Sequence, residues 1–165
     1  MSIRIYNILF LCRHNSARSI IAEAYVNSRK IAHLRAYSGG EAPLGHIHPM
    51  ALEVLKEAGI PTDNLRSKSW DEFARPGAPV MDLIINLCDE PAKEQCPTWP
   101  GKPVTAHWAI PDPAAVEGSD IFKRAAFANV LAYIKQRTDF LQHFSAEQLE
   151  NLAKHSRENA GKSTG

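Results

Sequence analysis

The feature that most constrains the fold is an apolar segment that runs through a short polar loop into a helical pattern. Residues 8–11 are apolar, the loop begins at Cys12 and closes at Arg18, and apolar residues then recur at a spacing of four. This order predicts a strand, a tight loop and a helix, so that loop amides and a helix N-terminus surround one space. Such an arrangement is typical of a binding site for an anion.

Cys12 and Arg18 supply the chemistry of that site. The five residues between them let the loop curl until the guanidinium faces the sulfur across a space about one tetrahedral oxyanion wide. The positive surroundings favour a nucleophilic thiolate, and the arginine fork can bind two oxygens at once. Asn15 tolerates a left-handed backbone, and Ser16 or Ser19 can donate a hydrogen bond to the sulfur. The alternative is a buried, inert cysteine near a surface arginine.

Strands and helices alternate along the rest of the chain. Extended patterns cover 3–11, 34–38, 81–88 and 104–108, and helical patterns cover 19–32, 50–58 and 120–144. We expect Gly59 to end the second helix, Ser119 to cap the last one, and Ser69 with Glu72 to form a capping box before 70–73. Only a weak helical turn around Leu149 and Leu152 follows. The alternation predicts an α/β fold with a doubly wound parallel sheet.

Size and composition narrow the class of protein. A length of 165 residues with 44% hydrophobic residues fits one globular domain. The net charge of +1 gives no footprint for nucleic acid or a membrane surface, and no signal segment or membrane span is apparent. Three cysteines, an odd number, argue against a disulfide framework. We therefore expect a cytoplasmic protein.

Two more thiols fall near the same predicted edge of the sheet. The strand 81–88 delivers Cys88 to its carboxyl end as the first strand delivers Cys12, and ligands bind at that edge of open α/β sheets. Seven residues separate Cys88 from Cys96, which matches no common zinc pattern. The three thiols could form a relay of disulfide exchange, or Cys88 could be a buried strand-end residue and Cys96 an exposed loop residue.

Asp112 follows the fourth predicted strand, between two prolines. A carboxyl group there could protonate an oxygen that departs when the thiolate attacks an oxyanion, or it could merely cap its own turn. His46, His48 and His107 are interpreted as structural, and His48 precedes Pro49 as in a turn before a helix. Asp112 is therefore a candidate general acid.

The segment Cys12-Arg-His-Asn-Ser-Ala-Arg18-Ser19 resembles the anion loop of the low-molecular-weight protein tyrosine phosphatase superfamily. Residues 65–73, 88–97 and 105–113 look like its arsenate reductase branch, and the resemblance covers about 8–144. It implies an α/β three-layer sandwich with a four-stranded parallel sheet, formed as a single domain by residues 1–144. Residues 145–165 would be a partly disordered extension. No metal and no organic cofactor is implied.

The resemblance also implies a reaction, the reduction of arsenate to arsenite in arsenic detoxification. Cys12 would attack the arsenic, Asp112 would protonate the leaving oxygen, and Cys88 and then Cys96 would carry the oxidation outward as disulfides. The reductant would be thioredoxin, or glutaredoxin with glutathione. The arsenate or phosphate anion would lie in the loop formed by Arg13, His14, Asn15, Ser16, Ala17, Arg18 and Ser19.

Several positions depart from the family pattern. His14 stands where the loop usually has glycine, which implies an uncommon backbone conformation or an altered loop, and Ala17 replaces a cysteine of phosphatase members. Ala114 and Ala115 replace the tyrosines with which phosphatases grip an aromatic ester. Some members bind potassium near the loop, where Lys68 would here supply the positive charge.

Two other functions remain open from the sequence. The first is a phosphotyrosine or phosphomonoester phosphatase that forms a phosphocysteine at Cys12, with Asp112 as acid and then base. The second is a non-catalytic module that senses an oxyanion or redox state through a thiol switch.

Overall fold

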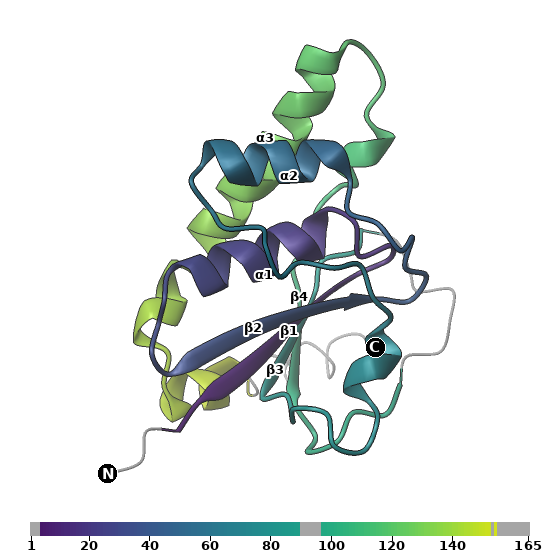
Figure 1. Cartoon of the computed structure of the whole chain (residues 1–165). Helices are drawn as coiled ribbons and strands as arrows, with labels where there is room; N and C mark the ends of the chain where they lie inside the picture. Colours follow the sequence, from purple (N-terminus) through teal and green to yellow (C-terminus); the bar gives the residue numbers. More distant parts are fainter. Residues whose placement is uncertain (1–3, 90–96, 153, 155–165) are drawn as a thin grey trace, which may run out of the picture.

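Four parallel strands form a single sheet at the centre of the molecule (Figure 1). The structure, a computed structural model, describes residues 4–89, 97–152 and 154. The strands are β1 (Tyr6–Cys12), β2 (Leu34–Gly40), β3 (Leu83–Asn86) and β4 (Val104–His107), in the order β2-β1-β3-β4. Each neighbouring pair is parallel, which confirms the predicted four-stranded parallel sheet.

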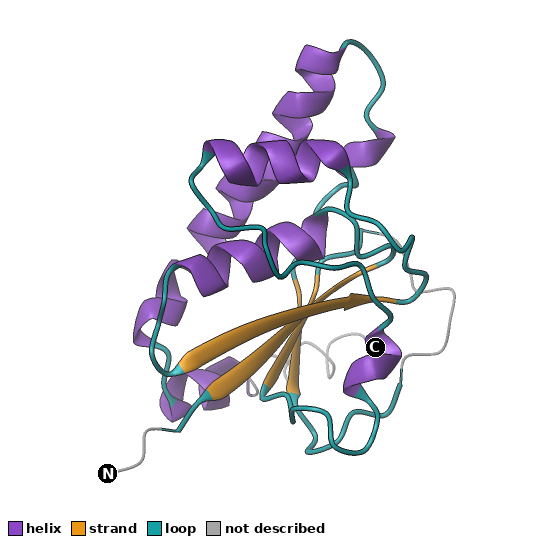
Figure 2. Ribbon diagram, viewed as in Figure 1, coloured by secondary structure: helices purple, strands orange, loops and turns teal. Residues whose placement is uncertain are grey.

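Three α-helices lie together on one face of the sheet (Figure 2). They are α1 (Arg18–Ser28), α2 (Pro49–Glu57) and α3 (Asp120–Thr138). The other face is covered by the short 3₁₀ helix η1 (Trp70–Phe73), which packs with Met81 on strands β1 and β3. The two covering layers are therefore unequal in size.

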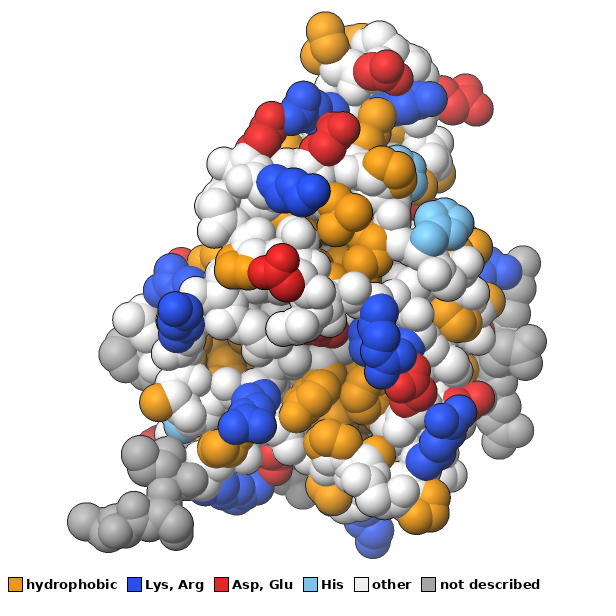
Figure 3. All heavy atoms as spheres, in the orientation of Figure 1, with side chains coloured by type: hydrophobic (Ala, Val, Ile, Leu, Met, Phe, Trp, Pro, Cys, Tyr) orange, Lys and Arg blue, Asp and Glu red, His pale blue; other side chains and the backbone are white. Residues whose placement is uncertain are grey.

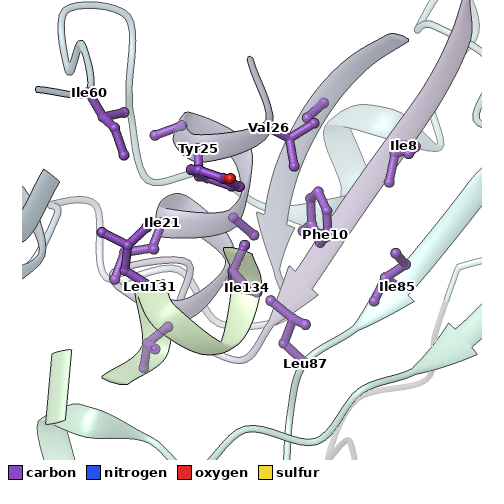
Figure 4. Packing of buried hydrophobic residues seen from close by; sticks show 14 of the residues in the cluster. Ile8, Phe10, Ile21, Tyr25, Val26, Ile60, Ile85, Leu87, Leu131 and Ile134 are labelled. Atoms are coloured by element: carbon purple, nitrogen blue, oxygen red, sulfur yellow. The ribbon is translucent and has the colours of Figure 1, made fainter. Parts of the chain in front are cut away.

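The alternation of side chains along β1 connects these layers. Ile8 and Phe10 are fully buried in the larger cluster with the α-helices (Figure 4), and Leu9 and Leu11 point into the smaller cluster with η1. A strand buried on both faces needs the continuous apolar run that the sequence shows. This burial fixes the position of Cys12, the last residue of the strand.

Several element boundaries differ from the predictions. Helix α1 ends at Ser28 rather than 32, since Lys30 takes a left-handed conformation with φ 52°. Helix α3 ends at Thr138, and the chain continues as the 3₁₀ helix η3 (Asp139–His143). Strand β3 is four residues long. Sequence periodicity places the centres of elements better than their ends because frayed ends depend on local caps.

The predicted caps are mostly confirmed. Gly59 has φ 74°, and the Ser119 and Ser69 hydroxyls accept from backbone N–H groups. The capping box is wrong in its second half, because Glu72 forms two hydrogen bonds with Arg66 instead, at 2.6 and 2.9 Å.

The end of the described chain packs against the domain. Residues 146–152 are helical, as the sequence predicts, and Leu149 and Leu152 contact the core. The division at residue 144 stays a prediction. On the face seen in Figure 3, basic and acidic side chains are interspersed. Within the described residues, no helix is long and apolar enough to cross a membrane.

Candidate active site

The loop between β1 and α1 holds Cys12 in a network of side-chain hydrogen bonds. The Cys12 sulfur, which is buried, lies 2.8 Å from the Ser19 hydroxyl oxygen. That oxygen accepts from Asn15 Nδ2 at 2.7 Å, so the single hydroxyl hydrogen of Ser19 is left to point at the sulfur. A hydroxyl donor stabilises a thiolate, the nucleophilic form of cysteine.

Asn15 is the centre of this network. It has φ 47°, the left-handed conformation predicted for it, and its side chain is fully buried. Its Oδ1 accepts from the backbone N–H of Lys68 at 2.8 Å, while its Nδ2 donates to Ser19. Among the described non-glycine residues φ is positive at Asn15, Lys30 and Lys102 but not at His14. His14 therefore takes an ordinary backbone conformation in the loop, contrary to one of the two expectations.

A neighbouring segment holds the outer side of the loop. The backbone N–H groups of Ala42, Leu44 and His48 donate to the carbonyls of residues 13, 14 and 16, at 2.9, 3.2 and 2.9 Å. Because the C=O and N–H of one peptide point in opposite directions, the amides of residues 14, 15 and 17 point away from this segment. The loop amides thus face the inner side of the loop, where an anion can bind.

Gly40 makes this packing possible. A Cβ atom added there would lie 2.7 Å from the Arg13 carbonyl oxygen and 2.8 Å from that of Cys12. Only glycine lets β2 approach the loop this closely.

Arg18 begins α1 and is anchored by its Nη1 atom. Nη1 donates to the Ile110 carbonyl at 2.9 Å and to Asp89 at 3.2 Å. The guanidinium has three further N–H donors, on Nε and Nη2, with which it can bind an oxyanion. Its anchors hold it against rotation, which preserves the geometry of the fork.

A cavity of about 50 Å³ gathers the other candidate groups. It is lined by Arg13, His14, Arg18, Glu41, Cys88, Asp89 and Asp112. Asp112 also caps the 3₁₀ helix η2 (Pro113–Ala115), since its Oδ1 accepts from Ala114 N at 3.0 Å. The two readings of Asp112, as cap and as site residue, are therefore both compatible with its position.

Cys88 lies just beyond the end of β3. Asn86 Oδ1 accepts from its N–H at 2.9 Å, and its carbonyl lies 2.5 Å from His107 Nε2. Burial raises the pKa of the Cys88 thiol to about 11, the negative charge of Cys12 adds to this, and Arg18 opposes it. The parallel pairing of β1 with β3, with Leu11 opposite Asn86, brings the two cysteines to the same edge of the sheet, as predicted.

Lys68 is buried beside the loop. Its Nζ donates to the Arg66 carbonyl at 2.8 Å and lies 3.3 Å from Ser38 Oγ and 3.5 Å from Glu23 Oε1. Burial lowers the pKa of Lys68, and the Glu23 charge partly offsets that. The structure thus has an ammonium group at the place where the resemblance implied a positive charge.

The structure brings most of the predicted site residues together. Arg13, His14, Arg18, Cys88 and Asp112 line the cavity, and Asn15, Ser16, Ala17 and Ser19 form the buried loop beside Cys12. Cys96 lies outside the described residues. Within the described part of the chain, no group of three or more His, Cys, Asp or Glu side chains is arranged to hold a metal ion.

Sequence reasoning missed three contributors to the site. Asp89 and the Ile110 carbonyl anchor Arg18, and the Glu41 side chain lines the cavity. Asp89 directly follows the predicted strand 81–88 and Glu41 directly follows β2, and a position at a strand end is a sequence signal for a site residue. However, a carboxylate is not an expected neighbour of an anion. A backbone carbonyl carries no sequence signal at all.

The fold, the loop and the cavity define an α/β protein with a cysteine in an anion-binding loop, and comparison with known proteins agrees with this class. The family model of low molecular weight phosphotyrosine protein phosphatases matches residues 7–157, so the chain belongs to that family.

The curated relatives it matches include arsenate reductases. That of Halalkalibacterium halodurans is 35% identical over 130 residues, which cover 79% of this chain and 90% of the relative. The arsenate reductase of Bacillus subtilis is 34% identical over 130 residues, which again cover 79% of this chain and 90% of the relative. Among solved structures, an arsenate reductase from Archaeoglobus fulgidus is 27% identical with a TM-score of 0.61, covering 83% of this chain and 99% of that one.

Proposed function

We propose that the protein reduces arsenate to arsenite and so serves arsenic detoxification in the cytoplasm. The observation that carries the proposal is the position of two thiols, Cys12 and Cys88, at the adjacent ends of β1 and β3, beside one cavity with Arg18 and Asp112. A phosphatase needs one thiol there, whereas a reductase needs two. The arsenate reductases among the relatives support the same reaction.

In the first step Cys12 attacks the arsenic of arsenate. The loop amides and Arg18 bind the oxygens, and a hydroxyl of arsenate leaves as water with the proton of Asp112. The Ser19 hydroxyl, 2.8 Å from the sulfur, stabilises the thiolate before the attack. The product is a covalent bond between Cys12 and pentavalent arsenic.

In the second step Cys88 attacks the Cys12 sulfur. A disulfide bond forms, the sulfur–arsenic bond breaks, and its electron pair stays on arsenic, which leaves as trivalent arsenite. The proton of Cys88 passes to an arsenite oxygen or to solvent. Two thiols are oxidised and one arsenic atom is reduced by two electrons, so the step balances.

The disulfide must then be reduced. Cys96 attacks Cys88, frees Cys12, and presents a Cys88–Cys96 disulfide to thioredoxin, or to glutaredoxin with glutathione. The half-buried position of Cys88 beside the cavity, just beyond the end of β3, supports its part in this exchange.

Hydrolysis of phosphomonoesters is the second candidate. The family of the chain favours it, since the first step with phosphate in place of arsenate gives a phosphocysteine. Water, activated by Asp112 as a base, would release the phosphate. This reaction does not need Cys88.

The test is NADPH consumption by the purified protein with arsenate. One assay contains thioredoxin and its reductase, and the other contains glutathione, glutaredoxin and glutathione reductase. We expect turnover in one of them and none in a Cys88→Ser variant. No turnover in either assay, together with aryl phosphate hydrolysis that Cys12→Ser abolishes, would establish the phosphatase instead.

A further inference from the structure

A second, apolar cavity borders the oxyanion cavity at Asp112. Its volume is about 260 Å³. One wall is the turn 109–113 with Val116, and the opposite wall is α3, through Ala126, Val130 and Tyr133. The Tyr133 hydroxyl accepts from Arg137 Nε at 3.2 Å, which fixes the ring in that wall.

A shared residue and a hydrogen bond connect the apolar cavity with the anion site. Asp112 lines both cavities. Ile110, which lines the apolar one, accepts through its carbonyl from Arg18, which lines the other. A ligand whose oxyanion lies on Arg18 therefore has an apolar space next to it.

The shape and chemistry of this space select an aromatic group. A cavity of about 150 Å³ holds benzene, so a volume of about 260 Å³ has room for one ring. The walls offer proline, isoleucine and valine side chains to the ring, and the Asn129 amide and the Asp112 carboxyl as polar groups. The two cavities together fit an oxyanion head bonded directly to an aromatic body.

We propose that the protein also reduces aryl arsonates, with the arsonate head in the oxyanion cavity and the ring in the apolar cavity. The inference rests on the proposed arsenate reduction, because it uses the same two thiols. It adds a substrate class and gives the residues of the 109–113 turn and α3 a role in substrate selection.

The chemistry balances without any further reactant. Cys12 forms a bond to the arsenic, and an arsenic-bound hydroxyl leaves as water with the proton of Asp112. Cys88 then attacks the Cys12 sulfur, the sulfur–arsenic bond breaks, and the electron pair reduces arsenic to the trivalent state. The Cys88 proton goes to an oxygen of the product, an arylarsonous acid. The bond between carbon and arsenic is unchanged. The two thiols lose two electrons in forming the disulfide, and arsenic gains them.

The first experiment mixes the reduced protein with inorganic arsenate or phenylarsonate and no carrier protein. Disulfide formation is followed by intact mass, and the trivalent product by chromatography. We expect both compounds to oxidise the wild-type protein. In Ala126→Phe, which fills the apolar cavity from α3, the ratio of the phenylarsonate rate to the arsenate rate should fall by about tenfold or more.

Ala128→Phe is the matched control, because Ala128 is exposed on the same helix and does not line the cavity. Its ratio should equal that of the wild type. Ala109→Phe fills the cavity from the opposite wall at an exposed position and replaces Ala126→Phe if that variant does not fold.

A binding measurement separates this inference from the proposed function. Phenylphosphonate and inorganic phosphate, which are not reduced, are compared as protectors of Cys12 against iodoacetamide. We expect phenylphosphonate to protect at the lower concentration in wild type, and this preference to be lost in Ala126→Phe. That result supports the aryl site even if arsenate itself is not reduced.

The inference is overturned if arsenate oxidises the protein and phenylarsonate does not. It is equally overturned if Ala126→Phe and Ala128→Phe leave the same rate ratio, or if phenylphosphonate protects no better than phosphate. Failure with both arsenic compounds would instead overturn the proposed reduction, and the protection assay would then decide the aryl site alone.

Discussion

The two cysteines of the site are held in different ways. Cys12 is fixed through its side chain, because its sulfur meets Ser19, which Asn15 positions and the Lys68 backbone in turn supports. Cys88 is fixed through its backbone, by Asn86 on its N–H and His107 on its carbonyl. Within the described residues the hydrogen bonds of Cys88 are made by its backbone, and a side chain held in this way can still change its rotamer.

This difference matches the two tasks that we propose for Cys12 and Cys88. A nucleophile that attacks a bound anion benefits from one fixed position, since a displacement of an ångström costs rate. A thiol that attacks one sulfur and is then attacked by another must present itself in two directions. The comparison predicts that disturbing the Cys12 network harms every reaction, whereas disturbing Cys88 harms only the redox steps.

The largest effect should come from the cysteines themselves. Cys12→Ser should abolish both arsenate reduction and aryl phosphate hydrolysis, because a serine hydroxyl is not ionised at neutral pH. Cys88→Ser should abolish reduction and leave aryl phosphate hydrolysis within about twofold. The two assays on both variants check this. Loss of hydrolysis in Cys88→Ser would contradict the separation of the two cysteines.

Arg18→Lys should reduce kcat/KM for arsenate by about 100-fold. Lysine keeps the charge but cannot hold the Ile110 carbonyl and Asp89 while it also presents a fork to the anion. Steady-state kinetics measure the loss, and Arg66→Lys at an exposed ion pair serves as control. Equal rates in wild type and Arg18→Lys would show that charge alone is needed.

Asn15→Ala should cost about 1–3 kcal/mol in the free energy of unfolding, because it leaves the buried Lys68 N–H without its acceptor. Urea denaturation measures the change. Lys102→Ala is the matched control, since Lys102 is exposed and has a similar left-handed φ of 51°. It should change stability by less than about 0.5 kcal/mol. A similar cost in both would assign the effect to backbone conformation.

The smallest effect is a shift in the titration of Cys88. Its pKa of about 11 means that alkylation by iodoacetamide should be slow at neutral pH and rise through the alkaline range. Cys12→Ser removes the electrostatic contribution of Cys12 that raises the pKa of Cys88, so the pKa of Cys88 should fall and the alkylation profile should move to lower pH. Peptide mass spectrometry against pH gives both profiles. Identical profiles would mean that the sulfurs do not interact.

The sequence predicted the fold and the central loop well, for a physical reason. Strand β1 is buried on both faces, so its apolar run is unmistakable, and the loop chemistry of Cys12, Asn15 and Arg18 lies within seven consecutive residues. Patterns of this kind involve only neighbouring residues, so they can be predicted from the local sequence.

The support of that loop could not be predicted. Residues 41–48 looked like an irregular connection, yet their N–H groups hold three loop carbonyls. Asp89 and the Ile110 carbonyl hold Arg18 from 71 and 92 residues away. Backbone groups are the same at every position, so their pairing depends on tertiary structure and leaves no pattern in the sequence.

The close approach at Gly40 has a consequence for engineering. The anion loop packs directly against the end of β2. A Cβ atom at Gly40 would lie less than 3 Å from two carbonyl oxygens of the loop. A designer who transplants residues 12–19 alone into another scaffold would transfer the side chains of the loop but not the strand end against which the loop packs. The smallest transferable unit includes the glycine and the strand end that bears it.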